Sequence, residues 1–137
     1  MSAERRRFAC TTVQMELAQD PTGFQMEPHT DAANRWVSMM MYLPAEALQT
    51  EEAAQAAGTV LLNSTSGKEK RGVFGSGELP WKDGDFVPTA TIPFASNQLL
   101  AFAPCVTSWH AVMNYTGNET TRDSIQVMPP HPSFRFC

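Results

Sequence analysis

Short strand-like segments separated by turn-forming residues recur along most of this chain of 137 residues. Residues 11–17 alternate polar and apolar side chains, which predicts a half-buried strand with Val13, Met15 and Leu17 on its buried face. Residues 36–43 form an almost continuous apolar run of strand length, as expected of a strand that is covered on both faces. Such a succession predicts an all-β sandwich or barrel. The remaining strand-like segments are residues 59–63, 90–94, 98–103, 106–113 and 122–127.

Two segments depart from the strand pattern. Residues 44–57 are rich in Ala, Glu and Gln and are followed by Gly58, which suits one short surface helix or a helical loop with a glycine stop. Residues 64–89 are rich in Gly, Lys, Asp and Pro, and a loop of this length is typical either of a lid over a pocket or of a passive surface segment. As a lid, the loop would present Phe74 and Trp81 to a substrate.

Composition indicates a single domain over residues 1–137 and excludes several functions. A hydrophobic content of 42% with 18% charged residues is ordinary for a globular protein. The formal net charge is −4, whereas proteins that bind nucleic acid usually carry a basic excess, so no nucleic-acid partner is expected. The sequence contains no apolar run of membrane-spanning length and no secretory segment at its start. The three cysteines lack the spacing of a zinc site, which favours free thiols in a cytoplasmic protein without a membrane partner.

The most specific chemical pattern is a His-x-Asp pair, His29 and Asp31, followed much later by His110. Two histidines and one carboxylate are the ligand set of the facial non-haem iron(II) site. In a strand, side chains two residues apart share a face, so His29 and Asp31 can both reach one ion. The pair alone is weak, because a chance His-x-Asp or His-x-Glu has a probability of roughly 0.3 in a chain of this composition. His110 alone could equally be a buried histidine satisfied by hydrogen bonds.

Arg122 follows His110 closely enough in the sequence to lie on the next strand. A turn-forming cluster at residues 114–118 lies midway between His110 and Arg122, which predicts that the chain doubles back there. Arg122 would then return near His110 and could hold the far end of a small molecule whose near end touches the metal. Simpler interpretations stay open, since Arg122 could form an ion pair at the surface and Tyr42 could be a tyrosine of the core.

In pattern and order these residues resemble the iron(II)/2-oxoglutarate-dependent oxygenases, and most closely their prolyl-hydroxylase-like branch. The resemblance covers residues 24–127. Residues 28–31, Pro-His-Thr-Asp, are similar to the His-x-Asp motif of the family, and residues 108–112 are similar to the strand that carries its distal histidine. Residues 122–124, Arg-Asp-Ser, are similar to the Arg-x-Ser motif that binds 2-oxoglutarate.

The resemblance implies an all-β double-stranded β-helix, the jelly roll, with at most one or two short helices. Tyr42 matches a tyrosine that helps to bind the cosubstrate in that branch, and Met40, two residues earlier, would face the same site. The implied site comprises the iron(II) ligands His29, Asp31 and His110 and the 2-oxoglutarate-binding residues Arg122, Tyr42, Ser124 and Met40.

The implied activity is that of a dioxygenase that uses iron(II), 2-oxoglutarate and dioxygen. It would hydroxylate an unidentified peptidyl or small-molecule substrate and release succinate and carbon dioxide. Asp31 favours hydroxylation over halogenation, because halogenating relatives lack this carboxylate. A cupin-like metal-binding protein is the first alternative, since it could use the same barrel without needing Arg122 and Ser124. The second is a catalytically inactive interaction domain, in which the ligand trio would be a coincidence.

Overall fold

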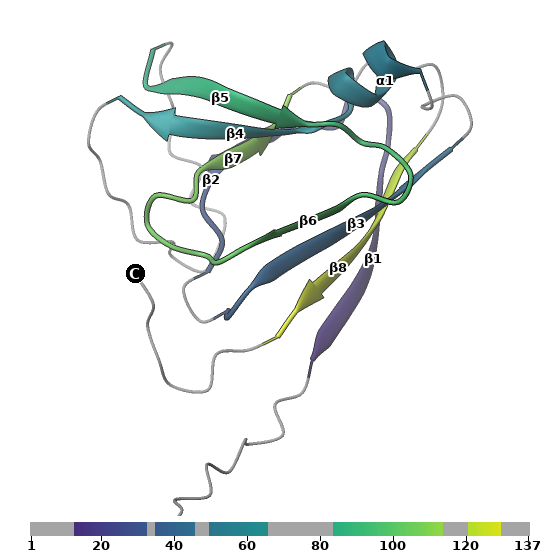
Figure 1. Ribbon diagram of the computed structural model, residues 1–137, viewed down its shortest axis with the longest axis horizontal. Helices are drawn as coiled ribbons and strands as arrows, with labels where there is room; N and C mark the ends of the chain where they lie inside the picture. Colours follow the sequence, from purple (N-terminus) through teal and green to yellow (C-terminus); the bar gives the residue numbers. More distant parts are fainter. Residues whose placement is uncertain (1–12, 33–34, 46–49, 66–83, 114–120, 130–137) are drawn as a thin grey trace, which may run out of the picture.

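The computed structural model describes residues 13–32, 35–45, 50–65, 84–113 and 121–129. Within these residues, eight strands form two four-stranded antiparallel sheets (Figure 1). One sheet, which we call the β8 sheet, has the order β1 (Gln14–Asp20), β8 (Arg122–Met128), β3 (Ser38–Pro44) and β6 (Leu99–Phe102). The other, the β7 sheet, has the order β2 (Met26–His29), β7 (His110–Val112), β4 (Thr59–Ser64) and β5 (Phe86–Ile92).

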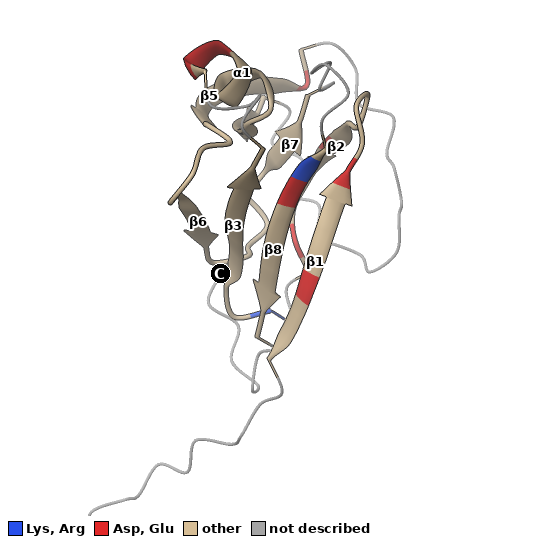
Figure 2. Cartoon of the chain, turned by 90° about the vertical axis from the view of Figure 1, so that its right-hand side faces the viewer, with Lys and Arg blue, Asp and Glu red and all other residues tan. Residues whose placement is uncertain are grey.

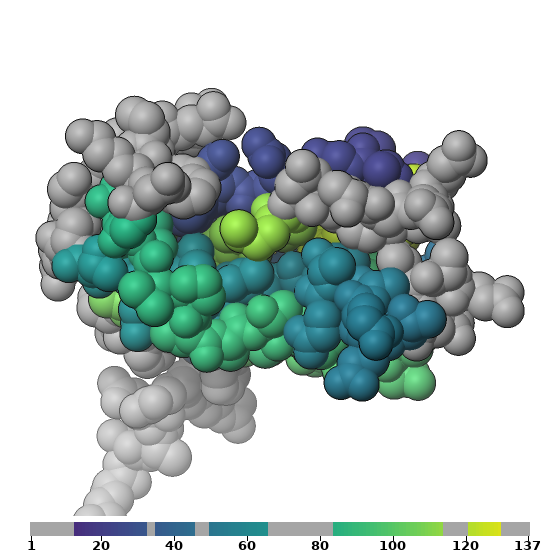
Figure 3. Space-filling model, turned by 90° about the horizontal axis from the view of Figure 1, so that it is seen from above, coloured from purple at the N-terminus to yellow at the C-terminus, as the bar shows by residue number. Residues whose placement is uncertain are grey.

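Successive strands alternate between the two sheets, except that β4 and β5 are neighbours within the β7 sheet. This winding is that of a double-stranded β-helix, so the predicted all-β jelly roll is confirmed. Figure 3, which looks down from above, shows β1 and β2 along one side of the molecule and β5 and α1 (Glu51–Ala56) along the other. Figure 1 shows the β7 sheet above the β8 sheet, so the two sheets face one another, and cavity-lining residues come from both.

Helix α1 begins and ends with clear local signals. The Thr50 hydroxyl accepts a hydrogen bond from the Ala53 N–H at 3.2 Å, which caps the first turn. After the helix, a Cβ atom on Gly58 would lie 2.6 Å from the carbonyl oxygen of Ile92. Glycine is therefore the residue that fits at this position. The predicted short helix with a glycine stop is confirmed. In the described part of the chain, no helix has the length and apolar character needed to cross a membrane.

The strand register collects several side chains on the inner face of the β8 sheet. Tyr42 on β3 lies opposite Ser124 on β8, and Arg122 on β8 lies opposite Asp20 on β1. Paired residues point to the same side of a sheet, and Met40, two residues before Tyr42, shares that side. Tyr42, Arg122 and Ser124 are buried, so this side faces the β7 sheet.

The buried apolar residues form two clusters, one between the sheets and one on the opposite face of the β7 sheet. Near α1, the rings of Tyr42 and Phe94 have their centroids 4.7 Å apart and pack with Ala57 and Leu100. Along the β7 sheet, a second cluster contains Val60, Leu62 and Ala111, with Phe86 and Trp109 packed against it. The first cluster holds β3 and β6 against the residues that follow α1 and β5, and the second holds β4 against β7.

The first strand faces the opposite way to the prediction. Val13, Met15 and Leu17 are 53%, 69% and 71% exposed, so the apolar face that was expected to be buried points outward. Asp20 faces inward, where it forms an ion pair with Arg122. The period of two then turns the odd-numbered residues of β1 outward. Alternation defines two faces of a strand but does not say which is buried, and the assignment from sequence was wrong.

Strand β3 is covered on one face only. Met41 and Leu43 are 47% and 41% exposed, so the expectation that both faces are covered was wrong. Figure 2, which looks onto the β8 sheet, shows no charged residue on β3 or β6. The outer face of this sheet carries large exposed apolar side chains from three strands, namely Met15, Leu17, Met41, Leu43 and Leu99.

The segment predicted as a long loop, residues 64–89, contains the start of a strand. β5 begins at Phe86, so the last residues of the predicted loop pair with β4. Pro88 within this strand obscured the signal, but β5 is an edge strand and a register irregularity lies beside the proline, where a missing N–H is tolerated. Phe74 and Trp81, the predicted lid aromatics, lie outside the described residues, as does the turn predicted at residues 114–118.

Candidate metal centre and its cavity

Three potential metal ligands lie together where β2 ends and β7 begins. His29 and His110 are directly opposite each other in the antiparallel β2–β7 pair. Asp31 follows just beyond the end of β2, rather than within the strand as predicted. The Nε2 atoms of both histidines lie 3.9 Å from Oδ1 of Asp31, and one ligand atom from each of the three residues lies within 4.8 Å of the others.

Backbone carbonyl groups orient both imidazole rings. Nδ1 of His29 lies 2.8 Å from the carbonyl oxygen of Glu27, and Nδ1 of His110 lies 3.0 Å from that of Ser108. A carbonyl oxygen only accepts hydrogen bonds, so in the neutral form of each ring Nδ1 carries the hydrogen and Nε2 keeps its lone pair. The free lone pairs of the two rings therefore point toward Asp31, which is the arrangement that metal-binding histidines usually have.

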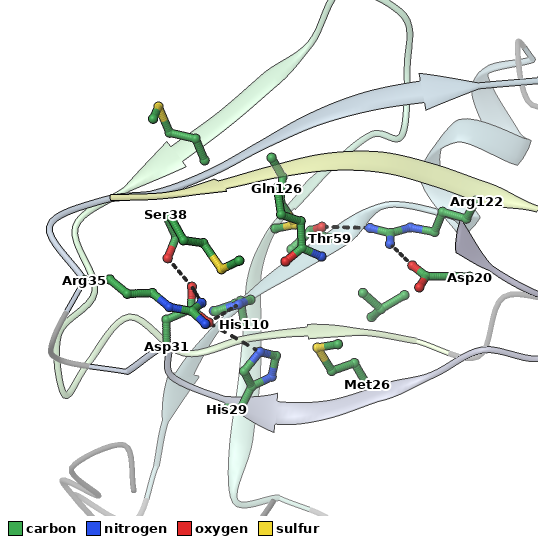
Figure 4. A pocket seen from close by; sticks show the side chains of 14 residues that line it. Asp20, Met26, His29, Asp31, Arg35, Ser38, Thr59, His110, Arg122 and Gln126 are labelled. Atoms are coloured by element: carbon green, nitrogen blue, oxygen red, sulfur yellow. Dashed lines mark hydrogen bonds and ion pairs between the residues drawn. The ribbon is translucent and has the colours of Figure 1, made fainter. Parts of the chain in front are cut away.

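The Asp31 carboxylate is held by its other oxygen. Oδ2 accepts a hydrogen bond from the Ser38 hydroxyl and lies 3.7 Å from Nη1 of Arg35. Oδ1 is the oxygen that faces the two imidazoles (Figure 4). The carboxylate is thus presented with one oxygen anchored and one available to an ion.

The environment of His110 favours its neutral form. Burial lowers the pKa of His110 from its ordinary value of 6.5, and the neighbouring His29 lowers it further. The hydrogen bond to Ser108 and the charge of Asp31 act in the opposite direction but are weaker. The neutral ring is the form that binds metals, so burial prepares this ligand.

The donor set fits a first-row transition metal. Imidazole nitrogens suit iron, copper, nickel or zinc, whereas calcium and magnesium prefer sites made of oxygen atoms. Two imidazoles with one carboxylate leave coordination positions open in the manner of the facial iron(II) triad. Exposure is graded across the cluster, since the His110 side chain is 6% exposed and the His29 side chain 33%, so one side of the cluster is accessible.

A cavity of about 210 Å³ extends from this cluster into the space between the sheets. The three potential ligands line one end and Arg122 the other, with Thr59 and Gln126 on the walls between them (Figure 4). Its volume lies below the about 300–1,000 Å³ of pockets for drug-sized ligands, so it suits a small metabolite. The remaining lining residues are Asp20, Arg35, Ser38 and five apolar side chains, Met26, Met39, Met40, Val112 and Met128.

Arg122 is 2% exposed and is held from several directions. Its Nε–H donates to the Ala57 carbonyl oxygen at 2.7 Å, Nη1 donates to Oδ2 of Asp20 at 2.6 Å, and Nη2 donates to the Thr59 hydroxyl at 3.3 Å. The guanidinium carbon also lies 4.8 Å from the centroid of the Phe94 ring, a cation–π distance. A fixed cation therefore lies at the end of the cavity opposite the potential metal ligands.

Tyr42 and Ser124, both predicted to bind the cosubstrate, lie beside Arg122 but do not line the cavity. The Tyr42 hydroxyl is 2.7 Å from the Thr59 hydroxyl, and burial raises the pKa of Tyr42 above 10.0 despite this hydrogen bond and the nearby Arg122. Ser124 is fully buried, and its hydroxyl has no hydrogen-bond partner among the described residues. Met40, by contrast, lines the cavity. The cosubstrate contacts of Tyr42 and Ser124 stay predictions.

Several residues of the site were not identified from the sequence. Ser38 shares a strand face with Met40, and Gln126 shares one with Arg122, so the period of two could have indicated both. Asp20 could not be found in this way, because the inward face of β1 was assigned incorrectly. Thr59 directly follows Gly58, and nothing in its local sequence distinguishes it from a structural strand residue.

The sequence matches no protein-family model and no curated protein. Among solved structures, the chain is similar to the crystal structure of a prolyl-4-hydroxylase from Pseudomonas putida, with a TM-score of 0.54 and 15% sequence identity. The similarity covers 87% of this chain and 52% of the hydroxylase, so the chain spans about half the length of that protein. At this identity the comparison shows a shared fold alone and leaves the activity to the residues of the site.

Proposed function

We propose that the protein is an iron(II)- and 2-oxoglutarate-dependent dioxygenase that hydroxylates a peptidyl or small-molecule substrate. The observation that carries this proposal is the convergence of two imidazole Nε2 atoms and one carboxylate oxygen at one end of a cavity whose other end holds Arg122. A cosubstrate with a metal-binding group at one end and a carboxylate at the other matches these two ends. The shared fold with a prolyl-4-hydroxylase supports the proposal.

His29, Asp31 and His110 would hold the iron(II). Bound iron(II) supplies the site at which 2-oxoglutarate and dioxygen react, with release of succinate and carbon dioxide. Ser38 and Arg35 keep the Asp31 carboxylate turned so that Oδ1 is available, and the Glu27 and Ser108 carbonyl groups hold both rings with Nε2 directed toward Asp31. These contacts fix the ligands before the metal arrives and thereby reduce the entropy lost on binding.

Arg122 would bind the remote carboxylate of 2-oxoglutarate through charge-assisted hydrogen bonds. The surrounding Met26, Met40, Val112 and Met128 give the cavity an apolar wall that limits the access of water. A charged pair is stronger in such a partly desolvated space than in water. The primary substrate would approach from the exposed side of His29, and peptidyl proline is the first substrate to test because of the fold comparison.

One observation favours a second candidate, a cupin-like metal-binding protein without 2-oxoglutarate chemistry. Asp20 already supplies a carboxylate to Arg122, so in this structure the arginine has an internal partner. If that pair is permanent, the cavity has no free cation for a cosubstrate. The metal cluster is the same in both candidates.

Adding 2-oxoglutarate to the anaerobic iron(II)-loaded protein distinguishes the two candidates. The dioxygenase is expected to show a cosubstrate-dependent change in visible absorption and, after oxygen is admitted, to form succinate slowly without substrate and faster with the correct one. A panel of proline-containing peptides and small metabolites then searches for that substrate. An iron-loaded protein with no spectral change and no succinate would favour the cupin-like alternative.

A further inference from the structure

Asp20 occupies the position at Arg122 that the carboxylate of a cosubstrate would take. Its Oδ2 atom lies 2.6 Å from Nη1 of the arginine, and both residues line the cavity. A guanidinium binds carboxylates through the N–H groups on its planar edge. One of the two terminal nitrogens of Arg122 is therefore already paired with an anion inside the cavity.

The arginine is held much more firmly than the aspartate. Arg122 is fixed by Ala57 and Thr59 in addition to Asp20, and its side chain is 3% exposed. The side chain of Asp20 is 14% exposed, and Arg122 is its one side-chain polar contact among the described residues. Asp20 also ends β1, which lies at the edge of the β8 sheet and leads into a turn at Gly23, where φ is +85°. An incoming carboxylate would meet a fixed cation and an anion that can turn away.

We infer that Asp20 is an internal competitor for Arg122, which lowers the affinity of the cavity for 2-oxoglutarate and thereby sets its preference among 2-oxo acids. The inference rests on the proposed function, because it takes Arg122 as the group that binds the remote carboxylate. Two carboxylates beside one guanidinium repel each other, so a 2-oxo diacid has to displace Asp20. A 2-oxo monoacid leaves the Asp20–Arg122 pair intact and meets no such competition.

The test is a titration of the anaerobic iron(II)-loaded protein with two ligands. These are 2-oxoglutarate and 2-oxopentanoate, which has the same chain length but no remote carboxylate. Asp20→Asn keeps the size of the side chain and removes its charge. In this variant the dissociation constant of 2-oxoglutarate is expected to fall at least about tenfold, while that of 2-oxopentanoate stays the same.

Glu16→Gln is the matched control. Glu16 lies on the same strand and the same face as Asp20, two full alternations further from Arg122, and it does not line the cavity. The substitution removes the same charge from the same strand, and neither ligand should bind differently. If Glu16→Gln strengthened the binding of 2-oxoglutarate as much as Asp20→Asn does, the effect would come from the overall charge of the protein, and the inference would be overturned.

The remaining outcomes separate this inference from the proposed function. Unchanged or weaker binding of 2-oxoglutarate to Asp20→Asn would overturn the inference, because Asp20 would then position Arg122 rather than compete for it. Arg122→Ala with wild-type affinity for 2-oxoglutarate would instead overturn the assigned role of Arg122 in the proposed function. Tighter binding to Asp20→Asn together with weaker binding to Arg122→Ala supports both.

Thermal unfolding of the ligand-free and metal-free protein gives a second measurement that does not depend on turnover. Asp20→Asn should have a lower Tm than wild type, because Arg122 keeps a buried charge without its anionic partner. With iron(II) and a fixed excess of 2-oxoglutarate, the rise in Tm should be larger for the variant than for wild type, in line with its tighter binding. A smaller or equal rise would overturn the inference. Asp20→Ser, which also removes the charge, takes the place of the Asn variant if that protein does not fold.

Discussion

His29 lies directly opposite His110 across the β2–β7 pair, with the centroids of their rings 4.2 Å apart. Two imidazoles so close to one another and to the Asp31 carboxylate form a compact set of donors. Because each Nδ1 is engaged by a backbone carbonyl, the pair directs both Nε2 atoms to one place. The arrangement depends on the strand register, so a shift of β2 against β7 would separate the ligands.

The first prediction concerns metal content. The purified protein should bind one iron(II) per chain, and replacing His29, Asp31 or His110 with alanine should each reduce the iron content strongly, since each removes one of three ligands. Metal analysis after anaerobic loading measures this directly. His131→Ala changes the remaining histidine of the sequence and should keep the wild-type iron content. A double variant, Asp31→Ala with His110→Ala, that retained full iron would contradict the assignment.

The second prediction concerns pH. Burial lowers the pKa of His110 in the folded protein below its ordinary value of 6.5, so the unfolded chain binds the proton more readily than the folded one. The metal-free protein should therefore lose stability as the pH falls through 6.5 toward the lowered pKa, by up to about 1.4 kcal/mol per pH unit. Urea unfolding at several pH values measures the slope. His110→Gln should show a shallower slope in this window, and an equal slope would assign the effect to other groups.

The third prediction isolates the arginine. Arg122→Ala should retain iron, because Arg122 is not a potential ligand, but should weaken 2-oxoglutarate binding. The loss of a charge-assisted pair in a partly desolvated pocket costs about 2–5 kcal/mol, which is roughly 30- to 4,000-fold in affinity. Arg122→Lys should recover part of this, because it keeps the charge without the planar edge. Anaerobic titration of the iron-loaded variants gives the three affinities, and a lysine variant equal to wild type would exclude a role for guanidinium geometry.

The fourth prediction links the backbone to the site. Gly58→Ala places a methyl group 2.6 Å from the Ile92 carbonyl oxygen and 2.8 Å from Cγ2 of Thr91, so the chain must shift there. Overpacking of this kind costs about 1–3 kcal/mol of unfolding free energy, measured by urea unfolding. Ala57 and Thr59, the neighbours of Gly58, both accept hydrogen bonds from Arg122, so 2-oxoglutarate should also bind more weakly. Weaker 2-oxoglutarate binding with undiminished stability would mean that the chain relieves the clash by moving Ala57 and Thr59, which changes the position of Arg122.

Sequence patterns predicted those parts of the fold that depend on local periodicity. The short helix, its stop at Gly58 and the succession of strands follow from residues close together in the chain. The shared face of Met40 and Tyr42 follows from the period of two alone. The cluster of His29, Asp31 and His110 was proposed from a motif, and the structure brings these three residues together.

The parts that could not be predicted depend on contacts between distant residues. Asp20 and Arg122 are 102 positions apart, and their ion pair lies on the face of β1 that points inward. Hydrophobicity favoured the opposite face, because Met15 and Leu17 would ordinarily be buried. The charge pair and the strand register together outweigh that preference. Phe86 was assigned to a loop because residues 64–89 are rich in Gly, Lys, Asp and Pro. Only the sheet order shows that β5 lies at an edge, where Pro88 is tolerated.

The Nε–H of Arg122 donates a hydrogen bond to the carbonyl oxygen of Ala57, the C-cap residue of α1. The last turn of this surface helix is therefore attached to the inner end of the cavity, although the helix itself contributes no lining residue. A ligand whose carboxylate pairs with the guanidinium would change the strength of the hydrogen bond from Arg122 to Ala57, and with it the stability of that turn. Hydrogen exchange at the Ala57 and Gly58 amides, which donate to Ala53 and Gln55, can thus report occupancy of a cavity that neither amide touches.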